Sequence, residues 1–208
     1  MDKIKEYFPD FTATQYEQLE VLGELYIEWN AKVNLVSRKD IEHIFDRHIL
    51  HAISIHHIMR FKAGSKILDL GTGGGLPGLP LAILFPESDF HLIDARSKKI
   101  MVVQDIVDRL SLSNVRATHG RAEELKSKYD FIVSRAVAQT KQLIEWTGNR
   151  FSSKEINAIP NGYILLKGGD ISKELKEAKV DRIADVYPII DFIQEPWYEE
   201  KKLIYIPA

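Results

Sequence analysis

The stretch ILDLGTGGGLPG, residues 67–78, is an apolar strand that runs into four glycines within five positions. Pro77 then suits the start of a helix. One glycine is enough for a tight strand-to-helix connection, whereas a longer run of bare backbone lets a ligand approach closely. We therefore expect a ligand site here, because open α/β sheets bind ligands at the carboxyl ends of their strands.

From Lys66 onward, short apolar runs alternate with helical stretches. This alternation predicts a mostly parallel, doubly wound α/β sheet, with the last two strands forming an antiparallel hairpin at one edge. The predicted strands are 66–70, 90–94, 114–118, 129–133, 162–166, 183–190 and 203–207. The predicted helices between them are 77–85, 97–110, 140–150 and 172–179.

The first sixty residues predict helices instead. Thr14 and Glu17 have the spacing of a capping box. An apolar stripe follows at helical spacing, formed by Leu19, Leu22, Tyr26, Trp29 and Val33. A second helix is expected over 40–59, with Ile41, Phe45, Ile49 and Ile53 on one face. We expect an N-terminal helical extension over 1–62 and an α/β domain over 63–208.

Composition narrows the class of protein further. The 208 residues are 45% hydrophobic and 28% charged, with a net charge of −2, which is typical of a soluble globular chain. Binding of nucleic acid by bulk charge is disfavoured, although a local basic face is compatible with this average. The absence of cysteine excludes disulfides, thiolate metal sites and a cysteine nucleophile. No secretory signal or membrane-spanning segment is evident, so we expect a cytoplasmic protein, and nothing in the sequence demands more than a monomer.

The glycine spacing indicates which ligand the turn binds. A dinucleotide fingerprint needs a third glycine at the position that Leu76 occupies, so a nicotinamide cofactor is disfavoured. Asp69, two residues before Gly71, can reach a cationic amino group. S-adenosylmethionine carries such a group and a sulfonium charge, and it has no pyrophosphate. This donor therefore suits the run from Gly71 through Gly73 and Gly75.

Two further acids follow the next strands. Asp94 ends the second strand, where a carboxylate can accept both hydroxyl protons of a ribose; it can equally cap the helix that starts near Ser97. Glu123 follows the third strand, in a loop that would flank the adenine. On sequence alone, a solvated acidic helix start is as good an interpretation of Glu123.

The fourth strand bears on the acceptor. Enzymes that methylate amino groups usually carry an Asp/Asn-Pro-Pro-aromatic segment there, and this chain has the sequence DFIVSRA over 130–136 instead. Arg135 only donates hydrogen bonds. The segment has no cluster of hydrogen-bond acceptors, and the chain has no cysteine. We therefore expect the methyl group to be received by a ring nitrogen with a free lone pair. Such a nucleophile needs positioning, by Arg135 with Arg121, and no general base.

Basic residues gather near this predicted site, in a distribution that suits nucleic acid phosphate. They are Arg96, Lys98, Lys99, Arg121 and Arg135, with Arg38, Lys39, Arg47 and Arg60 in the extension. A single surface lysine or arginine is more often merely solvated. Five of the seven histidines lie between His43 and His57. His48 and His51 could share a metal, but no third ligand has clear spacing, so we expect no metal site.

Several short motifs between about residues 26 and 136 occur in an order similar to that of one known family. They are Trp29-Asn30 with Asn34-Leu35, Arg47-His48, Asp94-Ala95-Arg96 with Lys98-Lys99, Gly120-Arg121-Ala122-Glu123 and Ser134-Arg135-Ala136. Together with the Leu-Pro-Gly after the glycines, they resemble the RsmG (GidB) family of ribosomal RNA methyltransferases. The last third matches more loosely, mainly through Leu166-Lys167-Gly168.

The resemblance implies a class I methyltransferase fold, Rossmann-like, with an N-terminal helical extension. It implies transfer of a methyl group from S-adenosylmethionine to N7 of a guanine in the decoding-region hairpin of small-subunit (16S) ribosomal RNA. It also implies cofactor contacts by Gly71, Leu76, Ala122, Glu123 and Arg135. The alternatives are a methyltransferase for a small molecule or a protein, and a nucleotide- or RNA-binding module without turnover.

Overall fold

A computed structural model describes residues 1–37 and 39–208. Over this part of the chain, one seven-stranded sheet has the strand order β3-β2-β1-β4-β5-β7-β6. The strands are β1 (Lys66–Leu70), β2 (Asp89–Asp94), β3 (Val115–His119), β4 (Phe131–Arg135), β5 (Gly162–Gly168), β6 (Asp185–Pro188) and β7 (Lys201–Pro207). Strands β1 to β5 are parallel, and β7 is antiparallel to both β5 and β6. The expected parallel sheet with an antiparallel edge hairpin is confirmed.

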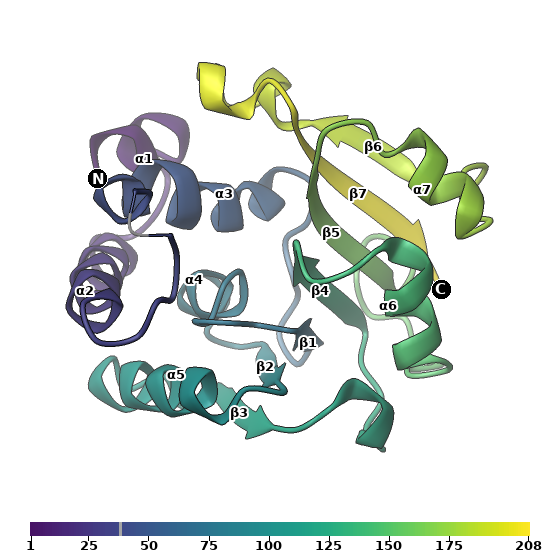
Figure 1. Cartoon of the computed structure of the whole chain (residues 1–208), viewed down its shortest axis with the longest axis horizontal. Helices are drawn as coiled ribbons and strands as arrows, with labels where there is room; N and C mark the ends of the chain where they lie inside the picture. Colours follow the sequence, from purple (N-terminus) through teal and green to yellow (C-terminus); the bar gives the residue numbers. More distant parts are fainter. Residues whose placement is uncertain (38) are drawn as a thin grey trace.

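Helices cover both faces of this sheet, as a doubly wound fold requires (Figure 1). One face carries α1 (Asp2–Tyr7), α2 (Ala13–Asn30), α3 (Leu50–Ile53), α4 (Gly78–Leu84) and α5 (Ser97–Arg109); the other carries α6 (Thr140–Thr147) and α7 (Ser172–Glu177). Short turns of 3₁₀ helix are η1 (Ile41–His43), η3 (Ser54–His57), η4 (Ala122–Glu124), η5 (Ile189–Asp191) and η6 (Pro196–Tyr198), and η2 (Ile44–Ile49) is π-helical. None of the described helices is long and apolar enough to cross a membrane.

The inner strands of the sheet supply two apolar cores, because successive side chains point to opposite faces. In β1, for example, Ile67 packs into the cluster under α2 to α5, while Leu68 and Leu70 pack under α6 and α7. The first cluster also contains Leu19 and Ile53 of the extension, so residues 1–62 cover one face of the sheet directly. The extension therefore helps to hold the sheet whose strand ends carry the candidate site.

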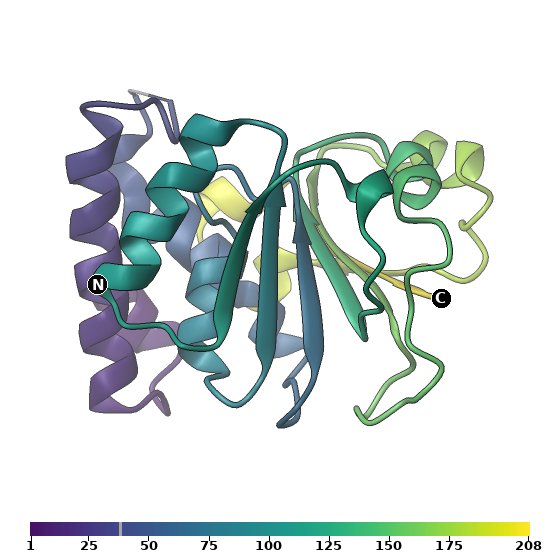
Figure 2. The same cartoon turned by 90° about the horizontal axis from the view of Figure 1, so that it is seen from below.

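The N-cap of helix α2 lies two residues before the expected Thr14. Thr12 is the N-cap, and it forms a reciprocal capping box with Gln15. The pairs Thr12/Gln15 and Thr14/Glu17 both have the spacing of a capping box. Only a cap at Thr12 places Phe11 directly before the cap and Tyr16 in the first turn, and the centroids of these two rings are 6.0 Å apart. This apolar pair fixes the entry of the chain into the helix. Helices α2 and α5 lie side by side (Figure 2). Trp29 Nε1 of α2 donates to Asp105 of α5 at 2.7 Å.

The expected helix over 40–59 is a succession of short helical turns rather than one regular helix. Its fully buried residues include Ile44, Ile49 and Ile53, whereas the predicted Phe45 is half-buried. The step of five from Ile44 to Ile49 suits the wider π-helical turn, which a stripe at ordinary helical spacing does not anticipate.

Candidate functional site

The loop between β1 and α4 requires its glycines for two physical reasons. Gly71, Gly73 and Gly75 have φ values of 68°, 57° and 100°, a backbone region that disfavours other residues. A Cβ on Gly71 would lie 2.5 Å from the side chain of Val137. The loop therefore offers bare backbone where the β1 and β4 ends meet.

Asp69 anchors this loop from below. Its side chain is fully buried, and Oδ2 accepts hydrogen bonds from the Thr72 hydroxyl at 2.5 Å and from the Gly78 backbone N–H at 2.8 Å. Burial raises the pKa of Asp69 to about 7, against the lowering effect of the Thr72 and Gly78 hydrogen bonds. The carboxylate thus ties the end of β1 to the start of α4.

Asp94, at the end of β2, connects the glycine loop to the following turn. Its oxygens accept from the backbone N–H groups of Gly73 and Arg96, each at 2.9 Å, and from the Arg96 side chain at 3.2 Å. Asp94 is only 6% exposed, and yet it lines a cavity at the carboxyl ends of the strands. Asp94 is therefore a rigidly held hydrogen-bond acceptor at the cavity wall. It also satisfies the backbone N–H of Arg96 at the start of α5.

A cavity of about 520 Å³ lies at the carboxyl ends of β1 to β4, a volume suited to one small ligand. Most of the predicted site residues line it: Gly71, Gly73, Leu76, Asp94, Arg121, Ala122, Glu123 and Arg135. Asp69 and Gly75 do not line it and lie in the support beneath. The structure thus gathers the three strand-end acids in one region, two of them at the cavity and one below it.

Arg135 ends β4 between the cavity and the extension. Its Nη1 lies 3.2 Å from Nδ1 of His48. Burial lowers the pKa of Arg135, which the nearby Tyr26, Asp69 and Tyr198 partly counteract. Within residues 1–37 and 39–208, no carboxylate lies within ion-pair distance of this guanidinium.

Sequence reasoning missed cavity residues that come from distant segments. Leu35, Val137 and Trp146 all line the cavity. Leu35 belongs to the extension, and its loop is held by the Asn30 side chain, whose oxygen accepts from the backbone N–H of Leu35 at 2.7 Å. For Leu35 a usable signal exists, because Trp29-Asn30 and Asn34-Leu35 occur together among the motifs that resemble the family. The sequence contains no such signal for Val137 or Trp146.

The basic residues divide between two roles. Arg96 and Lys98 border smaller hollows beside the cavity, on the surface expected to face phosphate. Lys99 is buried, and its Nζ donates to the Asn34 carbonyl, so it holds the extension loop. Arg47 pairs with Asp40 at 3.3 Å. Arg38 lies outside the described residues.

The histidine cluster is mostly aromatic packing. His51 contacts Trp197 edge-on, with ring centroids 5.4 Å apart, and His57 stacks on Phe192 at 4.9 Å. His48 alone among these three hydrogen-bonds to a cavity residue. Across the described residues, no three histidine, aspartate or glutamate side chains are arranged to hold a metal ion.

Comparisons with known proteins show which family the chain resembles. Residues 15–187 match the GidB family, described as rRNA small subunit methyltransferase G. Proteins named ribosomal RNA small subunit methyltransferase G from Cytophaga hutchinsonii and Flavobacterium johnsoniae are 46% and 45% identical. The first match covers 100% of both chains, and the second covers 100% of this chain and 98% of the relative.

Solved structures share the fold at low identity. An S-adenosylmethionine-dependent methyltransferase from Aquifex aeolicus has a TM-score of 0.59 at 15% identity, covering 82% of this chain and 97% of that one. The fibrillarin/Nop5p complex has a TM-score of 0.57 at 12% identity, covering 77% and 80%. The class I methyltransferase fold is therefore confirmed. With a family match over most of its length and relatives of equal length at more than 40% identity, the chain belongs to the GidB family.

Proposed function

We propose that this chain transfers a methyl group from S-adenosylmethionine to N7 of a guanine in the decoding-region hairpin of 16S ribosomal RNA. Membership of the family makes the chain a methyltransferase with this donor and ribosomal RNA as its substrate class. The position N7, the hairpin and the small subunit as partner are the proposal. The observation that carries it is the single cavity where the glycine loop, Asp94, Glu123 and Arg135 meet.

The residues present fit the donor. Bare backbone at Gly71 and Gly73, with the Leu76 side chain, would hold the methionine part. Asp94 is almost fully buried and is held by two backbone N–H groups. Its carboxylate oxygens can accept further hydrogen bonds from the side of the cavity, which suits ribose hydroxyls. Ala122 and Glu123 would lie along the adenine. Asp69 and Gly75 would act from below, by fixing the loop.

When bound, the donor supplies a methyl group on a positively charged sulfonium. The ring nitrogen N7 of guanine already has a free lone pair, so no residue has to remove a proton from it. The work left to the chain is orientation. Arg135 and Arg121, which only donate hydrogen bonds, would hold acceptor groups of the guanine or a phosphate at the cavity.

The basic surface around Arg96 and Lys98 supports an RNA substrate despite the net charge of −2. We expect the partner to be the small ribosomal subunit or its RNA, which places the chain in the cytoplasm. We expect it to act as a monomer, because the cavity is formed by one chain.

A transfer assay with labelled donor tests this function. The acceptors are unmethylated small subunits, naked small-subunit RNA, a metabolite mixture and a protein extract. We expect label in the ribosomal RNA, mapped to one guanine N7, and we expect Arg135→Ala to lose about 10²-fold or more of the rate while it remains folded. Label in metabolites or protein alone, label at another RNA atom, or donor binding without any product would each contradict the proposal. Full activity of Arg135→Ala would contradict its assigned role.

A further inference from the structure

The guanidinium of the half-buried Arg135 has an unusual hydrogen-bond partner. Buried arginines are normally paired with carboxylates, since an unpaired buried charge is costly. Arg135 instead donates a hydrogen bond to the imidazole of His48, at 3.2 Å between Nη1 and Nδ1. His48 comes from the π-helical turn η2, in the extension, whereas Arg135 ends β4.

The direction of this hydrogen bond follows from chemistry. A guanidinium only donates, so His48 Nδ1 must accept, and the proton of the neutral ring must reside on Nε2. The pKa of His48 is lowered to about 4, first by burial and then by the charge of Arg135; Arg47 and His43 lower it further, and Asp40 opposes them. At neutral pH His48 is therefore an uncharged acceptor.

Three further polar groups near Arg135, none of them a carboxylate, have no hydrogen-bond partner in the part of the chain that the structure describes. The Tyr26 hydroxyl, His48 Nε2 and His51 Nε2 are buried, without a hydrogen-bond partner among the described residues. The charge of Arg135 lowers the pKa of His51, after burial, so these rings lie in one electrostatic neighbourhood. The nearby carboxyl of Asp69 accepts from Thr72 and Gly78 through Oδ2, its Oδ1 is also buried without a partner among the described residues, and it forms no ion pair with Arg135.

A neutral hydrogen-bond acceptor can hold Arg135 without neutralising its charge, which a carboxylate cannot do. A carboxylate would fix the guanidinium but would also neutralise it and compete with any acceptor group in the cavity. The imidazole fixes one N–H and leaves the positive charge and the remaining donors free to act in the cavity that Arg135 lines.

We propose that His48 is a positioning residue for methyl transfer: by accepting a hydrogen bond from Arg135 it orients the guanidinium at the cavity wall without neutralising it. The helical extension thereby contributes directly to the reaction centre. This inference rests on the proposed function, in which Arg135 acts on the acceptor.

Two amide substitutions separate this role from packing. In His48→Asn the side-chain oxygen lies near the place of Nδ1, whereas in His48→Gln it lies one bond farther, near the place of Nε2. We expect kcat/KM for RNA to stay within about threefold of wild type in His48→Asn and to fall about tenfold in His48→Gln, at equal thermal midpoints. In an Arg135→Ala background the two variants should be equally active. The control His57→Gln, which alters a histidine stacked on Phe192, should leave kcat/KM unchanged.

Equal losses in the two amide variants, or a difference that persists without Arg135, would overturn the inference. A second readout does not depend on turnover: ¹⁵N chemical shifts of the His48 ring should show an unprotonated Nδ1 and a protonated Nε2. A protonated Nδ1 would refute the inference even if the wild-type chain transferred no methyl group, whereas wild-type inactivity with the expected shifts would refute the proposed function alone.

Discussion

Asp69 lies beneath the glycine loop, where its carboxyl group accepts hydrogen bonds from Thr72 and Gly78. In sequence it looks like a ligand-binding acid, because it comes two residues before the first glycine. In three dimensions it fixes the loop that Gly71 and Gly73 present to the cavity. The carboxylate of Asp94 is equally well held by hydrogen bonds, but unlike Asp69 it also lines the cavity.

The pKa of Asp69 makes its burial measurable. Burial raises this pKa to about 7 from the ordinary 3.8, so the folded chain keeps a proton that the unfolded chain releases. The free energy of unfolding should therefore fall as pH rises from about 4 to about 7. Against Asp69→Asn, which cannot ionise, wild type should lose up to about 4 kcal/mol over this range, as measured by urea unfolding without donor.

Comparing the two proteins cancels the histidines, whose lowered pKa values act in the opposite direction. A difference between wild type and Asp69→Asn that does not change with pH would show that Asp69 ionises freely in the folded chain.

The segment that follows β4 forms the cavity wall through Ala136 and Val137, and it is held by a cluster from two other elements. Glu174 of α7 accepts from the Thr140 backbone N–H at 2.6 Å and from its hydroxyl at 2.7 Å, and it pairs with Lys167 of β5 at 2.7 Å. Lys167 in turn donates to the Ala138 carbonyl at 2.5 Å. Helix α7 thus stabilises the wall without touching the ligand site.

Glu174→Gln keeps one acceptor for Thr140 and removes the charge that pairs with Lys167. We expect it to lower the free energy of unfolding by about 1–3 kcal/mol and to weaken donor binding several-fold by calorimetry, because the wall at Val137 loosens. The matched control is Glu177→Gln on the same helix, whose partner Lys173 is almost fully exposed; it should change neither quantity. Equal effects of the two substitutions would contradict this role of Glu174.

How much of these elements the sequence predicts depends on the range of the contacts involved. The strand Lys66–Leu70 and its glycine turn follow from local composition, so both were predicted closely. The predicted fourth strand, 129–133, begins two residues too early, because Tyr129 pairs with Phe151 outside the sheet proper. Leu35 and Trp146 reach the cavity only through packing between distant segments, which no local pattern encodes.

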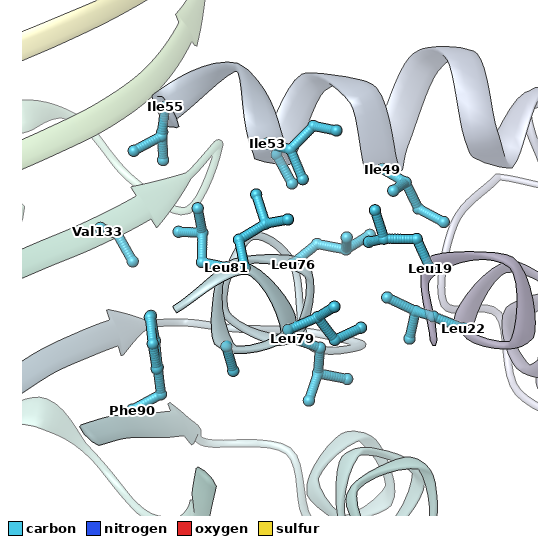
Figure 3. Close-up of a cluster of buried hydrophobic side chains, with 14 of the residues drawn as sticks. Leu19, Leu22, Ile49, Ile53, Ile55, Leu76, Leu79, Leu81, Phe90 and Val133 are labelled. Carbon is cyan, nitrogen blue, oxygen red and sulfur yellow. The ribbon is translucent and has the colours of Figure 1, made fainter. Parts of the chain in front are cut away.

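At the scale of the whole molecule, the extension and the sheet share one apolar core. Leu19, Leu22 and Ile53, all fully buried, pack toward Leu79 and Phe90 of the α/β part (Figure 3). The division into 1–62 and 63–208 stays a prediction about chain organisation. In physical terms the two parts cover each other, and the contact of His48 with Arg135 adds a polar link.

Residues 63–208 alone should therefore fail to fold cooperatively. The fragment would lose many fully buried apolar side chains of the extension, among them Leu19, Leu22, Ile49, Ile53 and Ile55. At about 2 kcal/mol each, their burial is comparable with the whole stability of a typical domain. Urea unfolding followed by circular dichroism should show a sigmoidal transition for the full chain and none for the fragment. A cooperative transition in the fragment would show that the sheet does not need the extension.

A crystal structure of the chain with S-adenosylmethionine is the most direct test. We expect the methionine part against Gly71 and Gly73, the ribose hydroxyls on Asp94, the adenine along Ala122 and the sulfonium methyl open toward Arg135. Donor bound elsewhere, for example in the groove at the opposite strand ends beside Arg116, or donor absent from this cavity at saturating concentration, would contradict this expectation.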